Sequence, residues 1–287
     1  MIEVERLRKN FEDKKRGTIR AVDDISFACQ PGEIFGLLGP NGAGKTTTLR
    51  MLATILEPTS GTARINGFDV RSQAQEVRRS IGYLSGSTAL YERLTAREMV
   101  TYFGSLYGLT ASDIASRIKE IFTELDMNEF ADSRCDKLST GQKQRVSIAR
   151  TIIHRPPVLF FDEPTNGLDI ITARTIIRFI RRCRNEGRTV VFSTHIMSEV
   201  ETLCDRIAIV YRGQIAAIGT LEELRERTGK QAFEQVFLRL IGEEDEEDDL
   251  NPDDTTGRNT KQGGDGNLRQ TAGGGLTAVS AGQEARR

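Results

Sequence analysis

The feature that most constrains this fold is a set of four short, almost entirely apolar runs separated by stretches with helical periodicity. The runs are residues 34–38, 157–161, 189–193 and 207–210. Such runs are typical of strands buried on both faces, which occur in parallel sheets covered by helices. Amphipathic helices are predicted between them, at residues 44–54, 141–154 and 172–185. Because strands and helices alternate, the sequence predicts an α/β fold with right-handed crossovers.

Two parts of the chain depart from this alternation. Residues 2–7 and 21–28 alternate apolar and polar side chains, which predicts half-exposed antiparallel strands. Residues 95–137 are polar and helical in pattern, and they open with Thr95 and Glu98 at the spacing of a capping box. We therefore expect an N-terminal antiparallel β subdomain, and a helical subdomain inserted into the core that contains the parallel sheet.

A glycine-rich loop follows the first apolar run and leads into a predicted helix. It fits the pattern G-x-x-x-x-G-K-[ST] and consists of Gly39, Pro40, Asn41, Gly42, Ala43, Gly44, Lys45 and Thr46, with Thr47 next in the helix. Glycines let consecutive N–H groups turn towards a phosphate, and the helix N-terminus adds roughly half a positive charge. We expect Lys45 to reach the β- and γ-phosphates of ATP and Thr46 to ligate Mg²⁺.

Two adjacent carboxylates, Asp162 and Glu163, follow the apolar run at residues 157–161. Parallel strands end at the carboxyl edge of the sheet, where ligands bind in α/β folds. We expect Asp162 to hold Mg²⁺ through water and Glu163 to polarise the water that attacks ATP. A positioned base contributes about 10²–10⁴-fold in rate. Together with the glycine-rich loop, this pair predicts that ATP is hydrolysed as well as bound.

Further motifs follow in a fixed order. Ser139 and Gln142 have capping-box spacing, which alone predicts only the start of a helix. The ordered motifs as a set resemble those of the ATP-binding subunit of ABC transporters: Walker A (residues 39–46), the LSGGQ signature with Thr140 in place of its first glycine (138–142), Walker B with its catalytic glutamate (159–163), the D-loop (166–169) and the switch histidine loop (192–195). The resemblance covers residues 1 to about 228 and implies a P-loop NTPase core.

The resemblance also implies a head-to-tail dimer that holds ATP between two copies or between the chain and a homologue. Ser139 and Gly141 of one subunit are then expected at the γ-phosphate that Lys45 of the other binds, and Gln142 is expected in the same nucleotide site. The resemblance assigns three more residues to the nucleotide site: His195 as a hydrogen-bonding partner of the γ-phosphate, Asp169 of the D-loop, and Phe11 as the aromatic residue stacked on adenine.

One position departs from the family pattern. After residues 81–85 the family usually has a glutamine that ligates Mg²⁺ and senses the membrane partner, whereas this chain has Gly86. Glycine offers no side-chain ligand. Water or the hydroxyl of Ser85 or Ser87 replaces it, or the coupling works differently. We hypothesise that ATP hydrolysis is slower than in a relative with the glutamine.

Within the family, the sequence is similar to bacterial subunits that drive a separate multi-span export permease. Residues 82–98 and 167–172 look most like sodium-extruding members, with drug or polysaccharide export as the next alternative. The insert at residues 95–137 would dock the permease. A soluble ABC-type ATPase acting on ribosomes or DNA and a regulator that binds ATP without hydrolysing it are the alternative functions. A P-loop kinase or GTPase would leave residues 138–142 and 192–195 unexplained.

Composition places further limits on the chain. The N-terminus has no apolar segment of a signal peptide, and no apolar run approaches the roughly 20 residues that span a membrane. We expect a cytoplasmic protein that is peripheral on the inner face of the membrane through its permease, with no nucleic-acid partner. The chain has two histidines and four widely separated cysteines, expected as reduced thiols in or near the core: Cys29, Cys135, Cys183 and Cys204.

The predicted domain organisation has three parts. Residues 1–228 form the ATP-binding domain, and residues 229–242 are a C-terminal extension. Nine of the twelve residues from Glu243 to Asp254 are acidic, and the glycine-rich remainder has few large apolar side chains. Such a segment cannot bury enough surface to offset the entropy of ordering, so residues 243–287 are expected to be a disordered tail.

Overall fold

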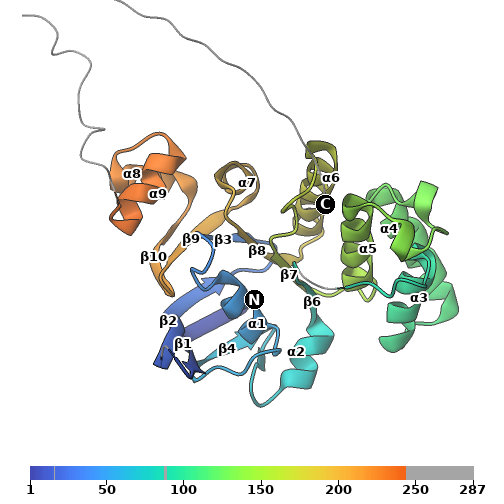
Figure 1. The fold of residues 1–287 in the computed structure, drawn as a ribbon, viewed down its shortest axis with the longest axis horizontal. Coiled ribbons are helices and arrows are strands. Elements are labelled where there is room, and N and C mark those ends of the chain that lie inside the picture. The colour runs from blue at the N-terminus through green and yellow to red at the C-terminus, as the bar shows by residue number, and fades with distance from the viewer. Residues whose placement is uncertain (16, 87–88, 244–287) are drawn as a thin grey trace, which may run out of the picture. The chain divides into compact units, whose positions relative to one another are not determined.

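The computed structural model describes residues 1–15, 17–86 and 89–243 (Figure 1). Residues Met1–Glu244 form one compact unit, and residues Asp245–Arg287 form a second that lies outside the described residues. The prediction of a disordered tail therefore concerns a segment of which only its first residue, Glu243, is described. Ser87, one of the two serines considered beside Gly86, is also outside the described residues.

A six-stranded sheet forms the centre of the compact unit, with the order β10-β9-β3-β8-β7-β6. Its strands are β3 (Ile34–Leu38), β6 (Ile81–Leu84), β7 (Val158–Asp162), β8 (Thr189–Thr194), β9 (Arg206–Tyr211) and β10 (Gln214–Gly219). All neighbouring pairs are parallel except β9 and β10, which are antiparallel. The four apolar runs are thus strands of a mainly parallel sheet, as predicted.

Apolar side chains cover both faces of this sheet, because successive residues of a strand point to opposite sides. In β7, Leu159 and Phe161 pack against helix α6 (Ile170–Asn185), whereas Val158 and Phe160 pack with helix α1 (Lys45–Leu52). Helix α2 (Ala74–Ser80) joins the α1 side. The helix predicted at residues 172–185 begins two residues earlier, at Ile170.

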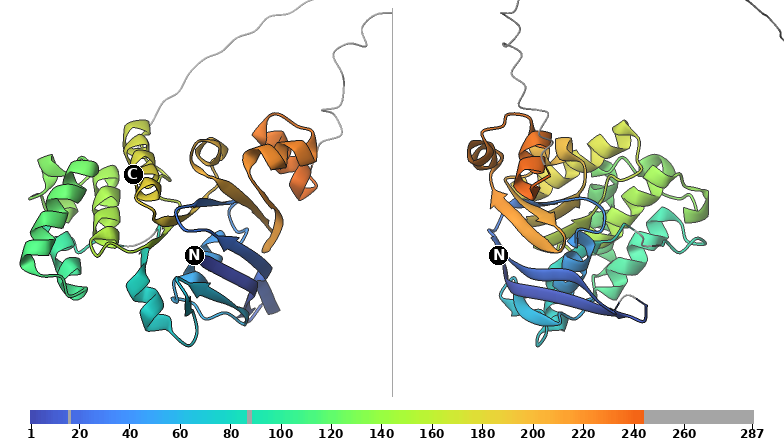
Figure 2. Two further views of the ribbon diagram at one scale, coloured as in Figure 1. Left: turned by 180° about the vertical axis from the view of Figure 1, so that it is seen from behind. Right: turned by 60° about the vertical axis from the view of Figure 1, so that its left-hand side comes forward.

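A third apolar cluster lies under the C-terminal helices. It joins β9 to α7 (Met197–Leu203), α8 (Leu221–Thr228) and α9 (Phe233–Ile241), and α8 and α9 lie side by side next to β10 in both figures (Figures 1 and 2). All four cysteines are free thiols. Three of them are buried and Cys204 is partly buried, which agrees with their expected place in or near the core.

The N-terminal region forms the antiparallel sheet that was predicted. Its order is β2-β1-β4-β5, with β1 (Ile2–Asp13), β2 (Gly17–Cys29), β4 (Ser60–Ile65) and β5 (Phe68–Asp69). Strands β1 and β2 extend well beyond the segments that alternation had indicated, because their hairpin end is exposed on both faces and carries no apolar pattern. The sheet packs its apolar side on α1, close to the glycine-rich loop.

Three helices stand together beyond the β6 edge of the central sheet: α3 (Ala96–Leu106), α4 (Ala111–Glu124) and α5 (Thr140–Ile152) (Figures 1 and 2). We call them the helical subdomain. Thr95 caps α3 in a capping box with Glu98, as the sequence predicted. Helix α5 lies beyond the predicted insert yet shares its apolar core with α3 and α4. The residue limits proposed for the domains remain predictions.

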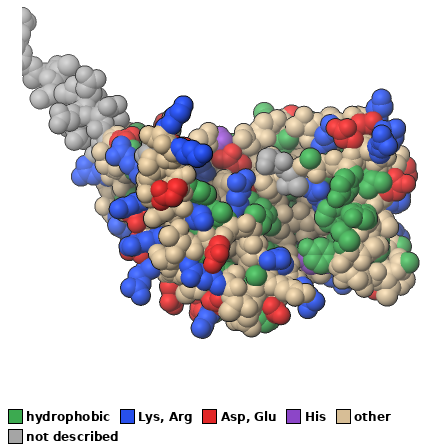
Figure 3. All heavy atoms as spheres, turned by 60° about the horizontal axis from the view of Figure 1, so that its bottom comes forward, with side chains coloured by type: hydrophobic (Ala, Val, Ile, Leu, Met, Phe, Trp, Pro, Cys, Tyr) green, Lys and Arg blue, Asp and Glu red, His purple; other side chains and the backbone are tan. Residues whose placement is uncertain are grey.

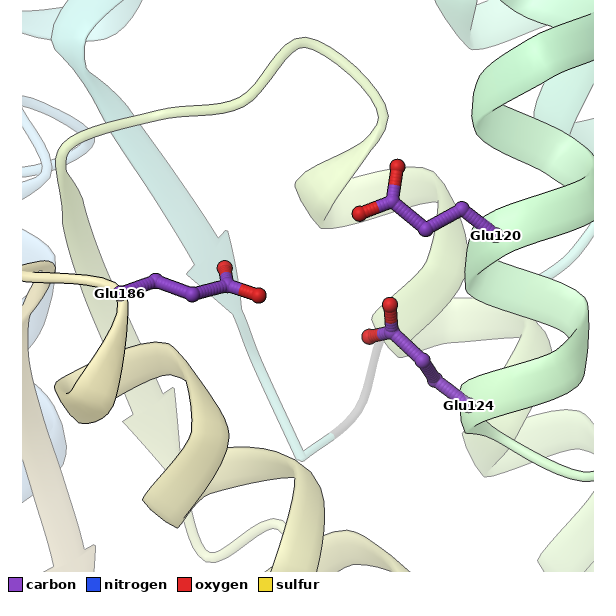
Figure 4. A group of neighbouring side chains, drawn as sticks. All are labelled: Glu120, Glu124 and Glu186. Carbon is purple, nitrogen blue, oxygen red and sulfur yellow. The ribbon is translucent and has the colours of Figure 1, made fainter.

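Glutamates at the junction of α4 and α6 form an ion-pair network (Figure 4). Glu120 and Glu124 project from α4 towards Glu186, which caps the end of α6. Arg182 pairs with Glu124 at 3.1 Å and with Glu186 at 3.0 Å, and Arg117 pairs with Glu120 at 2.6 Å. Burial raises the pKa of Glu124. The arginines offset the negative charge, so this group joins the helical subdomain to the core.

Candidate nucleotide-binding and catalytic site

The glycine-rich loop connects β3 to α1 and depends on its glycines sterically. Gly44 has φ 107°, and a Cβ there would approach the Ala21 carbonyl oxygen to 2.6 Å. The Lys45 side chain is buried and folds back over the loop, where Nζ donates to the carbonyl oxygens of Gly39 (2.6 Å) and Pro40 (3.1 Å). Burial lowers the pKa of Lys45. The loop thus holds an ammonium group above its own backbone, in a position to meet an anion.

Asp162 is the last residue of β7, and its buried carboxylate joins two strands and a helix. Its Oδ1 accepts hydrogen bonds from the Thr46 hydroxyl at the start of α1 (3.0 Å) and from the Ser193 hydroxyl on β8 (2.6 Å). Asp162 and Ser193 are directly opposite in the parallel pairing of β7 and β8. The Thr46 hydroxyl and the Asp162 carboxylate are hard oxygen donors, which suit Mg²⁺.

Glu163 is the point where the polar groups of the site converge. Its Oε1 lies 3.6 Å from Lys45 Nζ and 3.2 Å from His195 Nδ1, and its Oε2 accepts from the Asn166 side-chain amide (3.0 Å). Its backbone has φ 49°, which few residues other than glycine adopt. The Glu163 N–H donates to the carbonyl oxygen of Ser193 at 3.0 Å, which fixes this bend. Left-handed residues of this kind concentrate at functional sites.

Two cavities meet at these residues. One of about 130 Å³ surrounds the glycine-rich loop and is lined by Ala21, residues 41–47 and Glu163. The other, of about 330 Å³, is lined by polar residues from several elements, among them Thr46, Gly86, Gln144, Asp162, Glu163 and Asn166. A Cβ on Gly86 would meet only the Asp162 carbonyl oxygen, at an ordinary 3.5 Å. The position that departs from the family pattern therefore opens onto the carboxylates and has room for a side chain.

The signature segment is ordered around its own helix. Ser139 caps α5 in the predicted capping box with Gln142. Gly141 packs against α6 so closely that a Cβ there would lie 2.9 Å from Thr172 Oγ1. That hydroxyl donates to Asp169, the N-cap of α6, at 2.7 Å. The structure thus brings Gly141 and Asp169 close to the same Thr172 hydroxyl. Thr140 and Gln144 of α5 line the larger cavity, but Ser139, Gly141 and Gln142 line neither it nor the cavity around the glycine-rich loop.

Phe11 lies apart from these residues in the antiparallel sheet. It is 40% exposed on β1, opposite Ile19, and the Lys9 ammonium is 5.3 Å from the centre of its ring. It does not line the cavity around the glycine-rich loop. Its stacking on adenine remains a prediction.

Sequence reasoning missed two residues that hold the carboxylates. Ser193 bridges Asp162 and the Glu163 backbone, and Asn166 binds the Glu163 side chain. Ser193 is two residues before His195, and a polar residue at the end of an apolar strand was a usable signal. Asn166 was part of the D-loop motif, but nothing in the sequence indicated that it reaches back to Glu163.

A central parallel sheet with this glycine-rich loop between β3 and α1, and with paired carboxylates at the end of β7, defines a P-loop nucleoside triphosphatase. Residues 22–166 match the family model described as ABC transporter. The chain belongs to this family, and it is an ATP-binding, ATP-hydrolysing subunit of a transporter. No helix among the described residues has both the length and the apolar character that a membrane crossing requires.

Relatives and solved structures agree with this assignment. The chain is 42% identical to the ABC transporter ATP-binding protein NatA of Bacillus subtilis, over 81% of this chain and 95% of the relative. It is 36% identical to the linearmycin resistance ATP-binding protein LnrL of the same species, over 85% and 76% of the two chains. An ATP-binding subunit of an ABC transporter superposes with a TM-score of 0.76 at 28% identity, covering 84% of this chain and 99% of that one.

A second solved structure is a dimeric ATP-binding cassette in a post-hydrolysis state, bound to ADP and Pi. It superposes with a TM-score of 0.71 at 26% identity, covering 77% of this chain and 99% of that one. The fold predicted from the sequence, with its P-loop core, antiparallel β subdomain and helical subdomain, is confirmed.

Proposed function

We propose that this chain powers export through a separate multi-span permease, working as a head-to-tail dimer on the inner face of the membrane. The observation that carries the proposal is the division of the site. Lys45, Glu163 and His195 converge in one chain, whereas Ser139, Gly141 and Gln142 at the capped start of α5 line neither cavity of their own chain, although Thr140 and Gln144 line the larger one. A second subunit, either a copy or a homologue, would supply that helix end.

Within the site, we assign phosphate binding to the glycine-rich loop and Lys45. Lys45 Nζ now contacts two carbonyl oxygens and the Glu163 carboxylate. A γ-phosphate, which carries more negative charge than a carboxylate, would be a stronger partner for this ammonium group. Release from Lys45 would free the Glu163 carboxylate to accept a proton from the attacking water, with His195 holding that water in place. Thr46 and Asp162 would hold Mg²⁺, which neutralises charge on the phosphates when bound.

The surface of the helical subdomain supports the permease as partner. Four large side chains between residues 91 and 107 are exposed although they are apolar or aromatic: Tyr91, Tyr102, Leu106 and Tyr107. Figure 3 shows apolar side chains gathered over this part of the molecule. Exposed apolar patches on soluble chains mark contacts with proteins or membranes. A cytoplasmic loop of the permease would cover this patch, which keeps the chain peripheral.

Our proposal for the transported substrate rests on sequence similarity alone. The resemblance of residues 82–98 and 167–172 favours sodium ions. Names of relatives support the alternatives: one from Escherichia coli, 38% identical over 82% of this chain and 41% of its own length, is a probable multidrug transporter protein, and LnrL is named for linearmycin resistance. Co-purification of a multi-span membrane protein would favour export, whereas co-purification with ribosomes would favour a soluble ATPase.

The dimer is tested with Glu163→Gln, which keeps the shape of the site and removes the base. We expect ATP and Mg²⁺ to convert this variant into a stable dimer with no phosphate release, measured by light scattering after size exclusion. Lys45→Ala is the matched control and should stay monomeric, because it lacks the phosphate ligand. A Glu163→Gln protein that remains monomeric with saturating ATP would contradict the head-to-tail model.

A further inference from the structure

A side chain of the helical subdomain reaches the backbone next to Glu163. Gln144 lies in the second turn of α5, which begins at Thr140. Its side-chain amide donates a hydrogen bond of 2.7 Å to the carbonyl oxygen of Pro164. Pro164 directly follows Glu163 and is buried, where a carbonyl oxygen without a donor is costly. The contact therefore satisfies a backbone group immediately after the proposed base.

The backbone at Glu163 is strained, and the residue after it increases the strain. Glu163 has φ 49°, in the left-handed region that favours glycine. It also precedes a proline, and a residue in that place normally adopts extended backbone angles. Such a conformation persists only where the surrounding structure holds it. The bend that brings the Glu163 carboxylate to Lys45 and His195 therefore needs anchors.

The structure supplies an anchor on each side of this bend, and the two come from different parts of the fold. On one side, the Glu163 N–H donates to the carbonyl oxygen of Ser193, on β8 of the central sheet, at 3.0 Å. On the other side, the Pro164 carbonyl oxygen accepts from Gln144 of the helical subdomain. Because the proline ring fixes φ at Pro164, a restraint on this carbonyl also restrains the direction of the Glu163 carboxylate.

The position of Gln144 separates hydrolysis from ATP binding. Gln144 lines the larger cavity together with Asp162 and Glu163. It does not line the cavity around the glycine-rich loop, where Lys45 lies. Loss of the Gln144 amide should therefore disturb the hydrolytic step more than the binding of ATP.

We propose that Gln144 is a positioning residue for hydrolysis. It holds the bend at Glu163 through the Pro164 carbonyl, and so keeps the Glu163 carboxylate where it can accept a proton from the attacking water. The inference rests on Glu163 as the base of the proposed function. It goes further because it gives a part in the chemical step to a side chain of the helical subdomain that has no assigned role in the nucleotide site.

The test measures kcat and KM for ATP from phosphate release by the full chain with Mg²⁺. Gln144→Met keeps the length of the side chain and removes the donor. Gln144→Glu keeps its shape and places a negative charge against the Pro164 carbonyl oxygen. Thr151→Val is the control on the same helix, because the Thr151 hydroxyl donates within α5, to the Ser147 carbonyl oxygen at 2.8 Å. Urea denaturation followed by circular dichroism checks that each variant folds.

We expect Gln144→Met to lower kcat by about tenfold, which corresponds to roughly 1.4 kcal/mol in the activation free energy. KM for ATP should stay close to that of the parent, because the glycine-rich loop is untouched. Gln144→Glu should lower kcat at least as far. Thr151→Val should leave both constants unchanged.

A Gln144→Met protein with the kcat of the parent would overturn the inference. An equal fall in kcat for Thr151→Val, or a rise in KM that matches the fall in kcat, would also overturn it, because both indicate a general loosening of the fold. If Gln144→Met does not fold, Gln144→Glu decides by the same criteria.

Glu163→Gln, measured alongside, tests the proposed function separately. If Glu163→Gln hydrolyses ATP like the parent, the base is wrongly assigned and the role of Gln144 falls with it. If Glu163→Gln is inactive while Gln144→Met is unaffected, only the role of Gln144 is overturned.

Discussion

Ser193→Ala tests whether the site is held together by the hydroxyl that sequence reasoning missed. Ser193 is fully buried, and its Oγ donates to the buried Asp162 carboxylate at 2.6 Å. A hydrogen bond to a charged group contributes about 1.5–3 kcal/mol, because its loss leaves a buried carboxylate short of a donor. We therefore expect the free energy of unfolding to fall by about 2 kcal/mol.

Thr189→Val is the matched control on the same strand. The buried Thr189 hydroxyl donates to a neutral acceptor, the Gln30 carbonyl oxygen, at 3.3 Å. Valine has nearly the same shape, so this change removes a neutral hydrogen bond worth about 0.5–1.5 kcal/mol. The chain has no tryptophan, so urea denaturation followed by circular dichroism is the suitable assay.

Ser193→Ala should also change the rate of ATP hydrolysis. Asp162 and Glu163 are adjacent, and Ser193 contacts the carboxylate of one and the N–H of the other. Without the Ser193 hydroxyl, Asp162 and Glu163 are held less firmly, so kcat should fall by about tenfold. This corresponds to roughly 1.4 kcal/mol in the activation free energy. A Ser193→Ala protein with the stability of Thr189→Val and the turnover of the parent would refute the reasoning, because the short hydrogen bond to Asp162 would then contribute nothing.

Three further predictions follow from other features. Gly86→Gln should raise ATP turnover and alter its Mg²⁺ dependence, because the position lines the same cavity as Asp162 and Glu163 and has room for a side chain. Gly86→Ala is the control and should change neither property. A Gly86→Gln enzyme with unchanged turnover would contradict the hypothesis that glycine at this position slows hydrolysis. Burial lowers the pKa of His154 to about 4, so below pH 6.5 the unfolded chain binds more protons than the folded one. The free energy of unfolding should therefore fall with pH, by about 2 kcal/mol at pH 5. His154→Phe, which can keep the stacking on Tyr107, should lose this part of the pH dependence in urea denaturation. Tyr102→Glu should reduce permease binding in pull-down assays while ATP-dependent dimerisation stays normal; normal permease binding would show that the apolar patch is not the docking surface.

Local sequence signals predicted the central fold well. Each apolar run was short, continuous and bounded by turn residues, so burial on both faces was the simple interpretation and the sheet confirmed it. The capping boxes at Thr95 and Ser139 were equally local, because the motif that satisfies the first N–H groups of the helix spans only four consecutive residues. Strand ends in the hairpin were missed, since exposed strands carry no apolar period.

The chain by itself determined the chemical inventory of the site: a lysine in a glycine-rich turn, two carboxylates at a strand end and a histidine at another. Only the tertiary structure decided which of these groups touch. The contacts of Ser193 with Asp162 and of Asn166 with Glu163 depend on strand order and on the left-handed bend at Glu163. Strand order is set by the packing of residues far apart in the chain, and a linear pattern contains no measure of that distance.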